Sequence, residues 1–414
     1  MSDIAIAQPS GRAGFFGWRV TGAAFAIAVF AWGIGFYGPP IFLQTLHDLR
    51  GWPVALVSAA VTTHFLCGAA VVANLPPLHR RFGLVRVTRA GALLTAAGLL
   101  GWALAREPWQ LFGATLLSGA GWAMTSGAAL NAMIAPWFVR RRPAALGMAF
   151  NGASIGGVVF SPLWVALIAG LGFPLAALLV AGVAATALWV LAGRYLGRQP
   201  AEMGQVPDGG AAGPAALAAA APVAPPLGSP WRDRRFITLV AAATLALFAQ
   251  IGLVAQLFSL LLPLLGATGA GATMGAVTAP AVAGRSLLGR LLRPGADRRQ
   301  VAMANVALQA CGSVVLLCAG ASVPMVLLGC ALFGLGLGNV TSLPPLIVQG
   351  EFRPAEIARV VALVTAIGQA GYAFAPAVFG LLRELGGDGT PIFAAAAVIQ
   401  LLAAGALRFG RARA

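Results

Sequence analysis

The amino-acid sequence predicts an all-α membrane protein with twelve transmembrane helices arranged in two six-helix halves. Three observations support this fold class. Of the 414 residues, 59% are hydrophobic and only 9% are charged, whereas a soluble domain has about 25% charged residues. The apolar residues come in repeated blocks of about 20, the length at which a helix crosses a bilayer. The 54 Gly and 27 Pro are typical of closely packed, locally broken transmembrane helices.

Clusters of Arg, Pro or Gly bound the predicted spans. Several spans are longer than a bilayer requires, which allows tilt, kinks or helices that continue beyond the membrane. In chain order we predict spans at 17–44, 53–77, 84–105, 108–138, 143–169, 172–193, 234–262, 269–292, 298–319, 323–349, 354–385 and 389–409.

The distribution of arginine predicts the orientation. All 27 basic residues are Arg, which is typical of a GC-rich genome. With both termini in the cytoplasm, 23 of them fall in cytoplasmic segments, three outside and one, Arg285, within a span. This asymmetry satisfies the positive-inside rule. The net charge of +16 is therefore an orientation signal, with no nucleic-acid partner expected, and we expect a multi-pass protein of a bacterial inner membrane.

A central segment divides the chain. Residues 195–231 are rich in Ala, Gly and Pro and nearly uncharged, which predicts a flexible cytoplasmic linker between halves at 1–194 and 232–414. A Gly-x4-Pro pattern at Gly157 recurs at Gly371, a shift of 214 positions. Together with six spans on each side, this repeated pattern favours duplicated halves with a substrate path between them.

The local motifs resemble those of the monocarboxylate-transporter-like branch of the major facilitator superfamily. The junction between spans four and five reads W-F-V-R-R-R-P-A-A-L-G over 137–147, with small residues over 151–157 and a Ser-Pro pair at 161–162. The resemblance implies the major facilitator fold and a transport function. Weaker matches are Gly17-Trp18, Phe36-Tyr37-Gly38, Gly51-Trp52-Pro53, and Arg285 with Gly289.

Departures from the family pattern limit what the resemblance implies. The loop after span two reads Arg80-Arg81-Phe82-Gly83 where the superfamily usually has an Asp-Arg pair before Gly. Proton-coupled animal members carry an Asp four residues before the span-eight Arg, and here that position is Ala281. The resemblance therefore implies an anion-binding role for Arg285 but provides no residue for the family's proton relay.

The acidic residues exclude other functions. All eleven lie outside the spans or at their ends, so the buried carboxylate that a drug/proton antiporter usually needs is missing. The chain has no HExxH motif and only three His, which argues against a membrane hydrolase. The four Cys lack CxxC spacing, so we expect no metal and no cofactor. The chain is not expected to be an enzyme.

Arg285 is the charged residue that must lie inside a predicted span. It lies eight residues before Arg293, about 12 Å along a helix, which places it near mid-depth. Its planar guanidinium matches a carboxylate, so we predict that it binds the substrate. Two alternatives stay open: a structural bond to helix-end carbonyls or amides, and snorkelling of the side chain to the cytoplasmic surface.

The resemblance also suggests which other residues contact the substrate, because helices one, four, seven and ten, with parts of two, five, eight and eleven, line the central path in this superfamily. For each of them, packing or a local hydrogen bond is the alternative role. His64 is a titratable side chain deep in a span and is a possible proton site, with a structural hydrogen bond as the alternative. The candidate substrate-binding residues besides Arg285 are Tyr37, Trp122, Ser126, Asn339, Gln369 and Tyr372.

These observations predict a secondary transporter that moves a small organic monoanion across the membrane by alternating access, with Arg285 binding the carboxylate. The coupling is left open between a co-transported proton, an exchanged anion and uniport. We expect a monomer embedded in the lipid bilayer. The alternatives are an exporter of amphipathic or neutral compounds in which Arg285 is structural, and a non-transporting membrane sensor.

Overall fold

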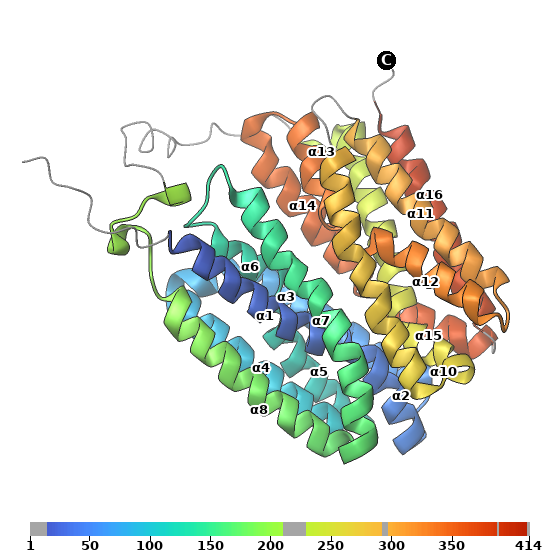
Figure 1. Ribbon diagram of the computed structural model, residues 1–414. Helices are drawn as coiled ribbons and strands as arrows, with labels where there is room; N and C mark the ends of the chain where they lie inside the picture. Colours follow the sequence, from blue (N-terminus) through green and yellow to red (C-terminus); the bar gives the residue numbers. More distant parts are fainter. Residues whose placement is uncertain (1–14, 210–228, 292–296, 387–388, 412–414) are drawn as a thin grey trace, which may run out of the picture.

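The described part of the chain folds into helices only (Figure 1). The computed structural model describes residues 15–209, 229–291, 297–386 and 389–411, and it leaves out the side chains of residues 209, 285–291, 354, 355 and 358. The N-terminal half contains α1 (Gly17–Gly35), α2 (Gly38–Arg50), α3 (Val54–Phe82), α4 (Leu84–Leu104), α5 (Pro108–Ala123), α6 (Gly127–Ile134), α7 (Arg142–Leu171) and α8 (Phe173–Leu191). The C-terminal half contains α10 (Arg234–Leu291), α11 (Arg298–Cys318), α12 (Val323–Leu337), α13 (Leu343–Glu351), α14 (Pro354–Tyr372), α15 (Ala375–Gly386) and α16 (Thr390–Phe409).

The helices confirm the predicted membrane fold. Nine helical segments of the described chain are long and apolar enough to cross a membrane. One of them, Arg234–Gly284, has 51 residues, far more than one crossing needs. It turns at Gly266, whose φ of 65° is a left-handed conformation that favours glycine, and so supplies two predicted spans. The predicted spans 108–138 and 323–349 are each divided into two shorter helices.

Four predicted spans are interrupted, and proline explains three of the interruptions. Pro39 follows the break between α1 and α2, Pro344 the break between α12 and α13, and Pro376 the break between α14 and α15. Proline fits the first turn of a helix, where its missing N–H has no intrahelical partner. The fourth break separates α5 from α6. Because α5 ends at Ala123 and α12 at Leu337, 214 positions apart, these two breaks repeat the shift seen in the sequence.

The two halves lie side by side in the bundle (Figure 1). The end of α8, where the linker begins, and the start of α10, where it has ended, lie at the same end of the bundle. We call this the linker end, and the opposite end, which carries Arg50, Gly172 and Gly266, the far end. Within the N-terminal half, α1 and α7 pack closely because α7 presents two glycines one turn apart, Gly152 and Gly156, to α1. A Cβ at Gly156 would lie 2.6 Å from the Val29 carbonyl oxygen of α1, so only a residue without a side chain fits.

Buried amides join the helices of the C-terminal half. The Gln309 side chain on α11 donates from Nε2 to Gln250 Oε1 on α10 at 3.0 Å. One turn earlier, Asn305 Oδ1 accepts from Asn339 Nδ2 at 3.0 Å. One turn later, Ser313 Oγ donates to Gln400 Oε1 on α16 at 2.8 Å. These positions recur every four residues along one face of α11, which therefore carries a polar stripe that joins three neighbouring segments.

At the linker end, a buried arginine ties the C-terminal half together. Arg299 on α11 is 1% exposed and donates to both carboxylate oxygens of Glu351 at 2.6 and 2.9 Å. It also donates to Thr238 Oγ1 and to the Arg235 carbonyl on α10. The bidentate geometry and the additional acceptors compensate for burying the charge. These bonds all lie within one half.

The first part of the predicted linker folds onto the N-terminal half. Residues 192–196 form a π-helical turn, and 201–203 and 207–209 form short 3-10 turns. The Asp208 carboxylate accepts hydrogen bonds from three consecutive backbone N–H groups, those of Val139, Arg140 and Arg141, at 3.2, 2.7 and 3.1 Å. Since Arg141 is the N-cap of α7, the carboxylate lies at a helix N-terminus, where negative charge is favoured.

Candidate functional site

An aromatic cluster occupies the centre of the bundle, at the level of the helix breaks. Phe65 on α3 is its hub: the ring centroid lies 6.3 Å from that of Phe36, 5.1 Å from His64, 5.5 Å from Trp122 and 5.9 Å from Tyr372. Phe36 lies in the break after α1, and Tyr372 is the last residue of α14. The breaks thus bring rings from both halves of the chain to one position.

Trp122 lies between α1 and α3 because both helices carry glycine where they meet the indole. A Cβ at Gly35 would collide with Trp122 Cδ1, and a Cβ at Gly68 would lie 3.3 Å from Cε3. The Trp122 side chain is 6% exposed, and its Nε1 has no hydrogen-bond partner within the described chain. An unsatisfied buried N–H has a free-energy cost, so a ligand that accepts from it would gain affinity.

His64 adjoins Trp122, with ring centroids 5.8 Å apart. Its Nδ1 lies 2.9 Å from Ser118 Oγ on α5, and Trp102 Nε1 on α4 donates to the same oxygen at 3.1 Å. The His64 side chain is 1% exposed, and its Nε2 has no partner among the described residues. The imidazole is therefore held at one nitrogen and unsatisfied at the other.

The two halves meet at this level and towards the far end. On α3, Ser58 Oγ accepts from Gln256 Nε2 of α10 at 3.1 Å, and Thr62 Oγ1 accepts from the Ala377 N–H of α15 at 3.1 Å. All of these atoms lie between the far end of α3 and the Phe65 ring. The contact between α3 and the C-terminal half is therefore polar towards the far end and aromatic at the centre.

A second contact between the halves joins α7 to α10. Gly157 of α7 packs so closely that a Cβ there would lie 2.6 Å from Thr278 Cγ2 and 2.8 Å from Tyr37 Cε2. Tyr37 is 2% exposed. This contact brings Tyr37, beside the α1–α2 break, against the helix that carries Arg285.

The structure brings four of the predicted site residues into one region. Trp122, Tyr372 and His64 contact Phe65 directly, and Tyr37 contacts Phe36 edge to face, with centroids 4.9 Å apart. Gln369 lies one turn before Tyr372 on α14 and is 9% exposed.

The remaining predicted residues lie elsewhere or outside the described side chains. Ser126 is buried at the break before α6. Asn339 is buried in the amide stripe of the C-terminal half, where it donates to Asn305. Arg285 belongs to α10, but its side chain lies outside the described residues.

Phe65 and Trp32 also belong to this region, although no sequence motif indicated them as site residues. Trp32 of α1 contacts Trp122 edge to face, with centroids 6.2 Å apart. Phe65 had a usable signal, because it is the only aromatic residue of the predicted span 53–77 and directly follows His64. Trp32 had none, since it is one of several aromatic residues near the end of the first span.

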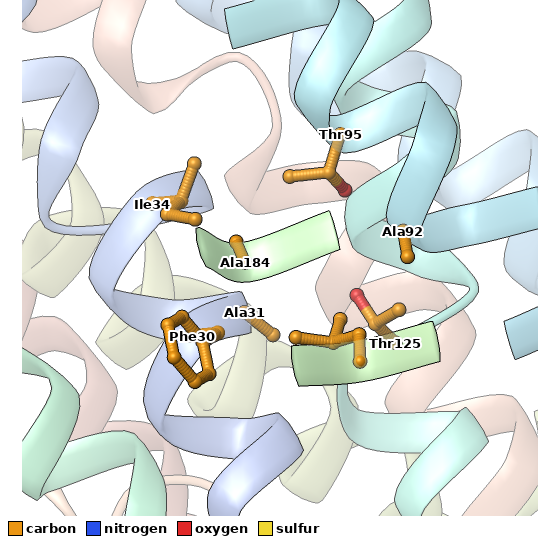
Figure 2. A pocket seen from close by; sticks show the side chains of 8 residues that line it. Phe30, Ala31, Ile34, Ala92, Thr95, Thr125 and Ala184 are labelled. Atoms are coloured by element: carbon orange, nitrogen blue, oxygen red, sulfur yellow. The ribbon is translucent and has the colours of Figure 1, made fainter. Parts of the chain in front are cut away.

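A small apolar cavity lies inside the N-terminal half, behind the α5–α6 break. Figure 2 shows side chains that line it, which come from α1, α4, the break and α8. Thr95 and Thr125 contribute the two hydroxyls; Thr125 donates to the Gly121 carbonyl, whereas Thr95 Oγ1 has no partner within the described chain. The apolar lining does not suit an anion. Its lining residues are Phe30, Ala31, Ile34, Ala92, Thr95, Thr125, Ala184 and Leu188.

The helical passes, the two halves and a buried aromatic centre between them define a polytopic membrane transporter. Residues 20–376 match the family model described as Major Facilitator Superfamily, and the chain belongs to this superfamily. Membership makes it a multi-pass transporter rather than an enzyme.

Similarity to individual proteins agrees with this assignment. The chain is 32% identical to mouse monocarboxylate transporter 11 over 178 residues, which cover 41% of this chain and 38% of that protein. It is 32% identical to rat monocarboxylate transporter 3 over 152 residues, covering 36% and 30%. The matched stretches thus span well under half of these relatives' own length.

Two solved structures show the fold. The crystal structure of a mutant of the nucleoside transporter NupG has a TM-score of 0.72 at 13% identity, with 96% of this chain and 100% of that chain covered. A bacterial homologue of the human lysosomal transporter Spinster has a TM-score of 0.70 at 14% identity, with 96% and 97% covered.

Proposed function

We propose that this chain is a secondary transporter that carries a small organic monoanion by alternating access, and that Arg285 binds the carboxylate of the substrate. The observation that carries the proposal is the isolation of Arg285 within a span of a chain whose acidic residues all lie outside the spans or at their ends. An arriving anion would neutralise that charge. The similarity to proteins named monocarboxylate transporters supports this class of substrate.

The helical register supports a position of Arg285 near the centre. Thr278 of α10 packs against Gly157 of α7 between the two halves. Position 285 follows seven residues later, two helical turns and about 10 Å along the axis, on the same face of α10. A monoanion bound there would lie between the halves, on the linker side of the Thr278 contact.

The aromatic cluster supplies a fitting environment for the rest of a small acid. Trp122 offers an unpaired N–H, and Phe65 and Tyr372 offer apolar ring surface. Sites for small molecules commonly combine such apolar walls with a few placed polar groups. We therefore include Tyr37, Trp122, Gln369 and Tyr372 in the proposed binding region.

The contacts between the halves support alternating access. Ser58 and Thr62 of α3, together with the Gly157–Thr278 contact, join the halves from the far end to the centre. A carrier needs such a closure on one side of its substrate, and must break it to open that side. With the positive-inside asymmetry, we propose that the linker end and both termini face the cytoplasm of a bacterial inner membrane.

Counterflow tests the proposal. Proteoliposomes containing the full chain would be preloaded with lactate, pyruvate, formate or a short aromatic acid, and uptake of the labelled acid measured. We expect saturable counterflow of at least one monocarboxylate. Arg285→Ala should reduce it at least tenfold, because a charge-assisted pair is lost, whereas Arg285→Lys should keep part of it.

Arg194→Ala is the matched control, because Arg194 is exposed at the linker end and should leave counterflow unchanged. If Arg285→Ala transports as well as the parent, Arg285 is not the anion anchor. If the parent exchanges none of the acids but confers resistance in a drug-susceptibility panel, the chain is an exporter of another class of compound.

A further inference from the structure

The last helix of each half ends at a glycine that an arginine side chain covers. A Cβ at Gly193, just after α8, would collide with Arg89 Nη2 of α4. A Cβ at Gly410, just after α16, would collide with Arg299 Nη1 of α11. The two glycines are 217 positions apart, as are the first residues of α8 and α16. The internal repeat therefore places an arginine at the same point of each half.

The two arginines differ in their partners. In the C-terminal half, both carboxylate oxygens of Glu351 accept from Arg299. In the N-terminal half, Arg89 Nε donates to the Trp189 carbonyl in the last turn of α8 at 3.4 Å, and its Cζ lies 4.5 Å from the centroid of the Trp189 ring. No carboxylate of the described chain lies within ion-pair distance of Arg89. The position 214 residues before Glu351 is Trp137, so the N-terminal half lacks the neutralising acid.

The linker end of the N-terminal half carries an unbalanced positive charge. Within residues 15–209, the acidic residues at this end are Glu202 and Asp208, and their carboxylates accept from backbone N–H groups. The three ion pairs of the described chain all lie in the C-terminal half. Such an excess of one sign attracts anions from the surroundings. The arginines at this end are Arg19, Arg80, Arg81, Arg86, Arg89, Arg140, Arg141, Arg142, Arg194 and Arg198.

The surface of α4 and α8 next to Arg89 is apolar and exposed. Leu93, one turn along α4 towards the far end, is 52% exposed, and Trp189 and Val190 at the end of α8 are 42% and 55% exposed. Tryptophan is enriched at the level of the lipid headgroups, where its ring meets both apolar and polar surroundings. Arg86, one turn from Arg89 towards the linker end, is also exposed. Because α4 and α8 form the edge of the N-terminal half away from the C-terminal half (Figure 1), this surface faces lipid.

From this geometry we propose that the α4–α8 seam, formed by Arg86, Arg89, Leu93, Trp189 and Val190, binds one anionic phospholipid. The phosphate of the headgroup accepts hydrogen bonds from Arg89, whose guanidinium is held in place by the end of α8, and from Arg86. The acyl chains lie along the exposed apolar side chains below. The lipid thus supplies the negative charge that Glu351 supplies in the other half. The seam lies outside the proposed substrate path, so this inference does not depend on Arg285.

Native mass spectrometry of the full chain in dodecyl maltoside tests the proposal. The protein would be titrated with phosphatidylglycerol or phosphatidylcholine of identical acyl chains, and the bound lipids counted. We expect one phosphatidylglycerol to bind about tenfold more tightly than phosphatidylcholine. The double variant Arg86→Gln with Arg89→Gln should weaken phosphatidylglycerol binding at least tenfold, because each arginine near the headgroup contributes about a factor of five.

A matched control removes the same charge from the other half. Arg234 and Arg408 are exposed at the linker end of the C-terminal half, and the double variant Arg234→Gln with Arg408→Gln should keep parental binding of phosphatidylglycerol. A further arm adds inorganic phosphate at millimolar concentration to the parent. It should not displace the lipid, because the acyl chains contribute to binding and the free ion has none.

Four outcomes would overturn the proposal. Equal affinity for the two lipids shows that the headgroup charge is not recognised. An equal loss in the control variant shows a general effect of net charge instead of a site at the seam. Displacement by inorganic phosphate assigns the arginines to a free anion. If the Arg86 and Arg89 double variant does not remain monodisperse, Arg86→Glu decides, because Arg86 is exposed and Arg89 stays in place; lipid binding unchanged in that variant refutes the site.

Discussion

The Glu384 carboxylate of α15 accepts a hydrogen bond from the Ala55 backbone N–H of α3 at 2.7 Å. Ala55 belongs to the first turn of α3, so the carboxylate of one half satisfies a free N–H at a helix N-terminus of the other. The helix dipole favours negative charge at this position. The two halves are thus joined at the far end by a hydrogen bond from a backbone N–H of one half to a carboxylate of the other.

Replacing Glu384 by Gln should favour the state in which the far end is open. The neutral amide keeps an acceptor but loses the charge–dipole attraction, a change of about 1 kcal/mol or about fivefold in population. A cysteine introduced at Ser58, in a background without the four native cysteines, should react about fivefold faster with an impermeant maleimide.

Glu356→Gln is the matched control for this substitution. Glu356 accepts from the Arg353 backbone N–H in the first turn of α14, within one half. Its loss should leave labelling at position 58 unchanged. Equal labelling in Glu384→Gln and the parent would show that the Ala55 contact does not hold the far end closed.

A methyl group at Gly157 should prevent the halves from closing at the centre. In Gly157→Ala, the new Cβ would lie 2.6 Å from Thr278 Cγ2 and 2.8 Å from Tyr37 Cε2, too close for either side chain to stay in place. We expect transport to fall at least tenfold with little loss of folded protein, measured as counterflow and as the monodisperse fraction in detergent.

Two further variants test this explanation. Gly147→Ala lies on the same helix with nothing within 4 Å of its Cβ, and should keep parental counterflow. Adding Thr278→Ala to Gly157→Ala removes one of the two clashing side chains and should restore transport in part. Full activity of Gly157→Ala alone would contradict the close approach of α7 and α10.

Composition and periodicity were sufficient to predict the membrane fold, because a helix that crosses lipid must be long, apolar and bounded by charged residues or helix breakers. They were not sufficient to predict the breaks. Pro39 and Pro376 each lie just inside the start of a new helix, whereas Pro162 and Pro280 lie inside continuous ones. Neighbouring helices can satisfy the backbone groups that a proline frees, so local sequence alone does not distinguish the two cases.

The candidate site was likewise predicted only in part from the sequence. Tyr37, Trp122 and Tyr372 were predicted from the resemblance, and their convergence follows from the helix breaks and from glycines on the neighbouring helices. Phe65 joins them only through tertiary packing between α3 and α14. Asn339 was predicted to contact substrate, which stays a prediction. Its side chain donates to Asn305 of α11, a pairing that no motif indicates.

The amide stripe of α11 should contribute measurably to stability. Gln309→Leu removes the donor to Gln250 Oε1 and leaves a buried carbonyl unsatisfied, at a cost of about 1 kcal/mol. Titration with a denaturing detergent would measure the free energy of unfolding. The double variant Gln250→Leu with Gln309→Leu should recover part of the loss, because no orphaned amide remains. Strict additivity of the two single losses would show that the pair does not interact.

The docked segment around Asp208 should remain in place down to acidic pH. Desolvation alone would raise the pKa of Asp208, but the backbone hydrogen bonds from Arg140, Arg141 and Val139 outweigh it and hold the pKa below its ordinary value near 3.8. A group whose pKa is lower in the folded state than in the unfolded state stabilises the folded state at pH values above its unfolded pKa. This stabilisation is lost as the pH falls through the pKa of the folded state. Hydrogen exchange of residues 200–209, corrected for its intrinsic pH dependence, should therefore stay constant from pH 7 to 5 and increase only below about pH 4.

Substitution of Asp208 should release this segment at neutral pH. Asp208→Ala removes the acceptor of all three N–H groups, a loss comparable to that of a helix-capping carboxylate, so protease Glu-C should cleave after Glu202 roughly fivefold faster. Asp48→Asn, at the far end, removes a carboxylate that accepts from Gln44 and should leave the cleavage rate unchanged. If Asp208→Ala is cleaved no faster than the parent, the carboxylate does not hold residues 200–209 on the N-terminal half.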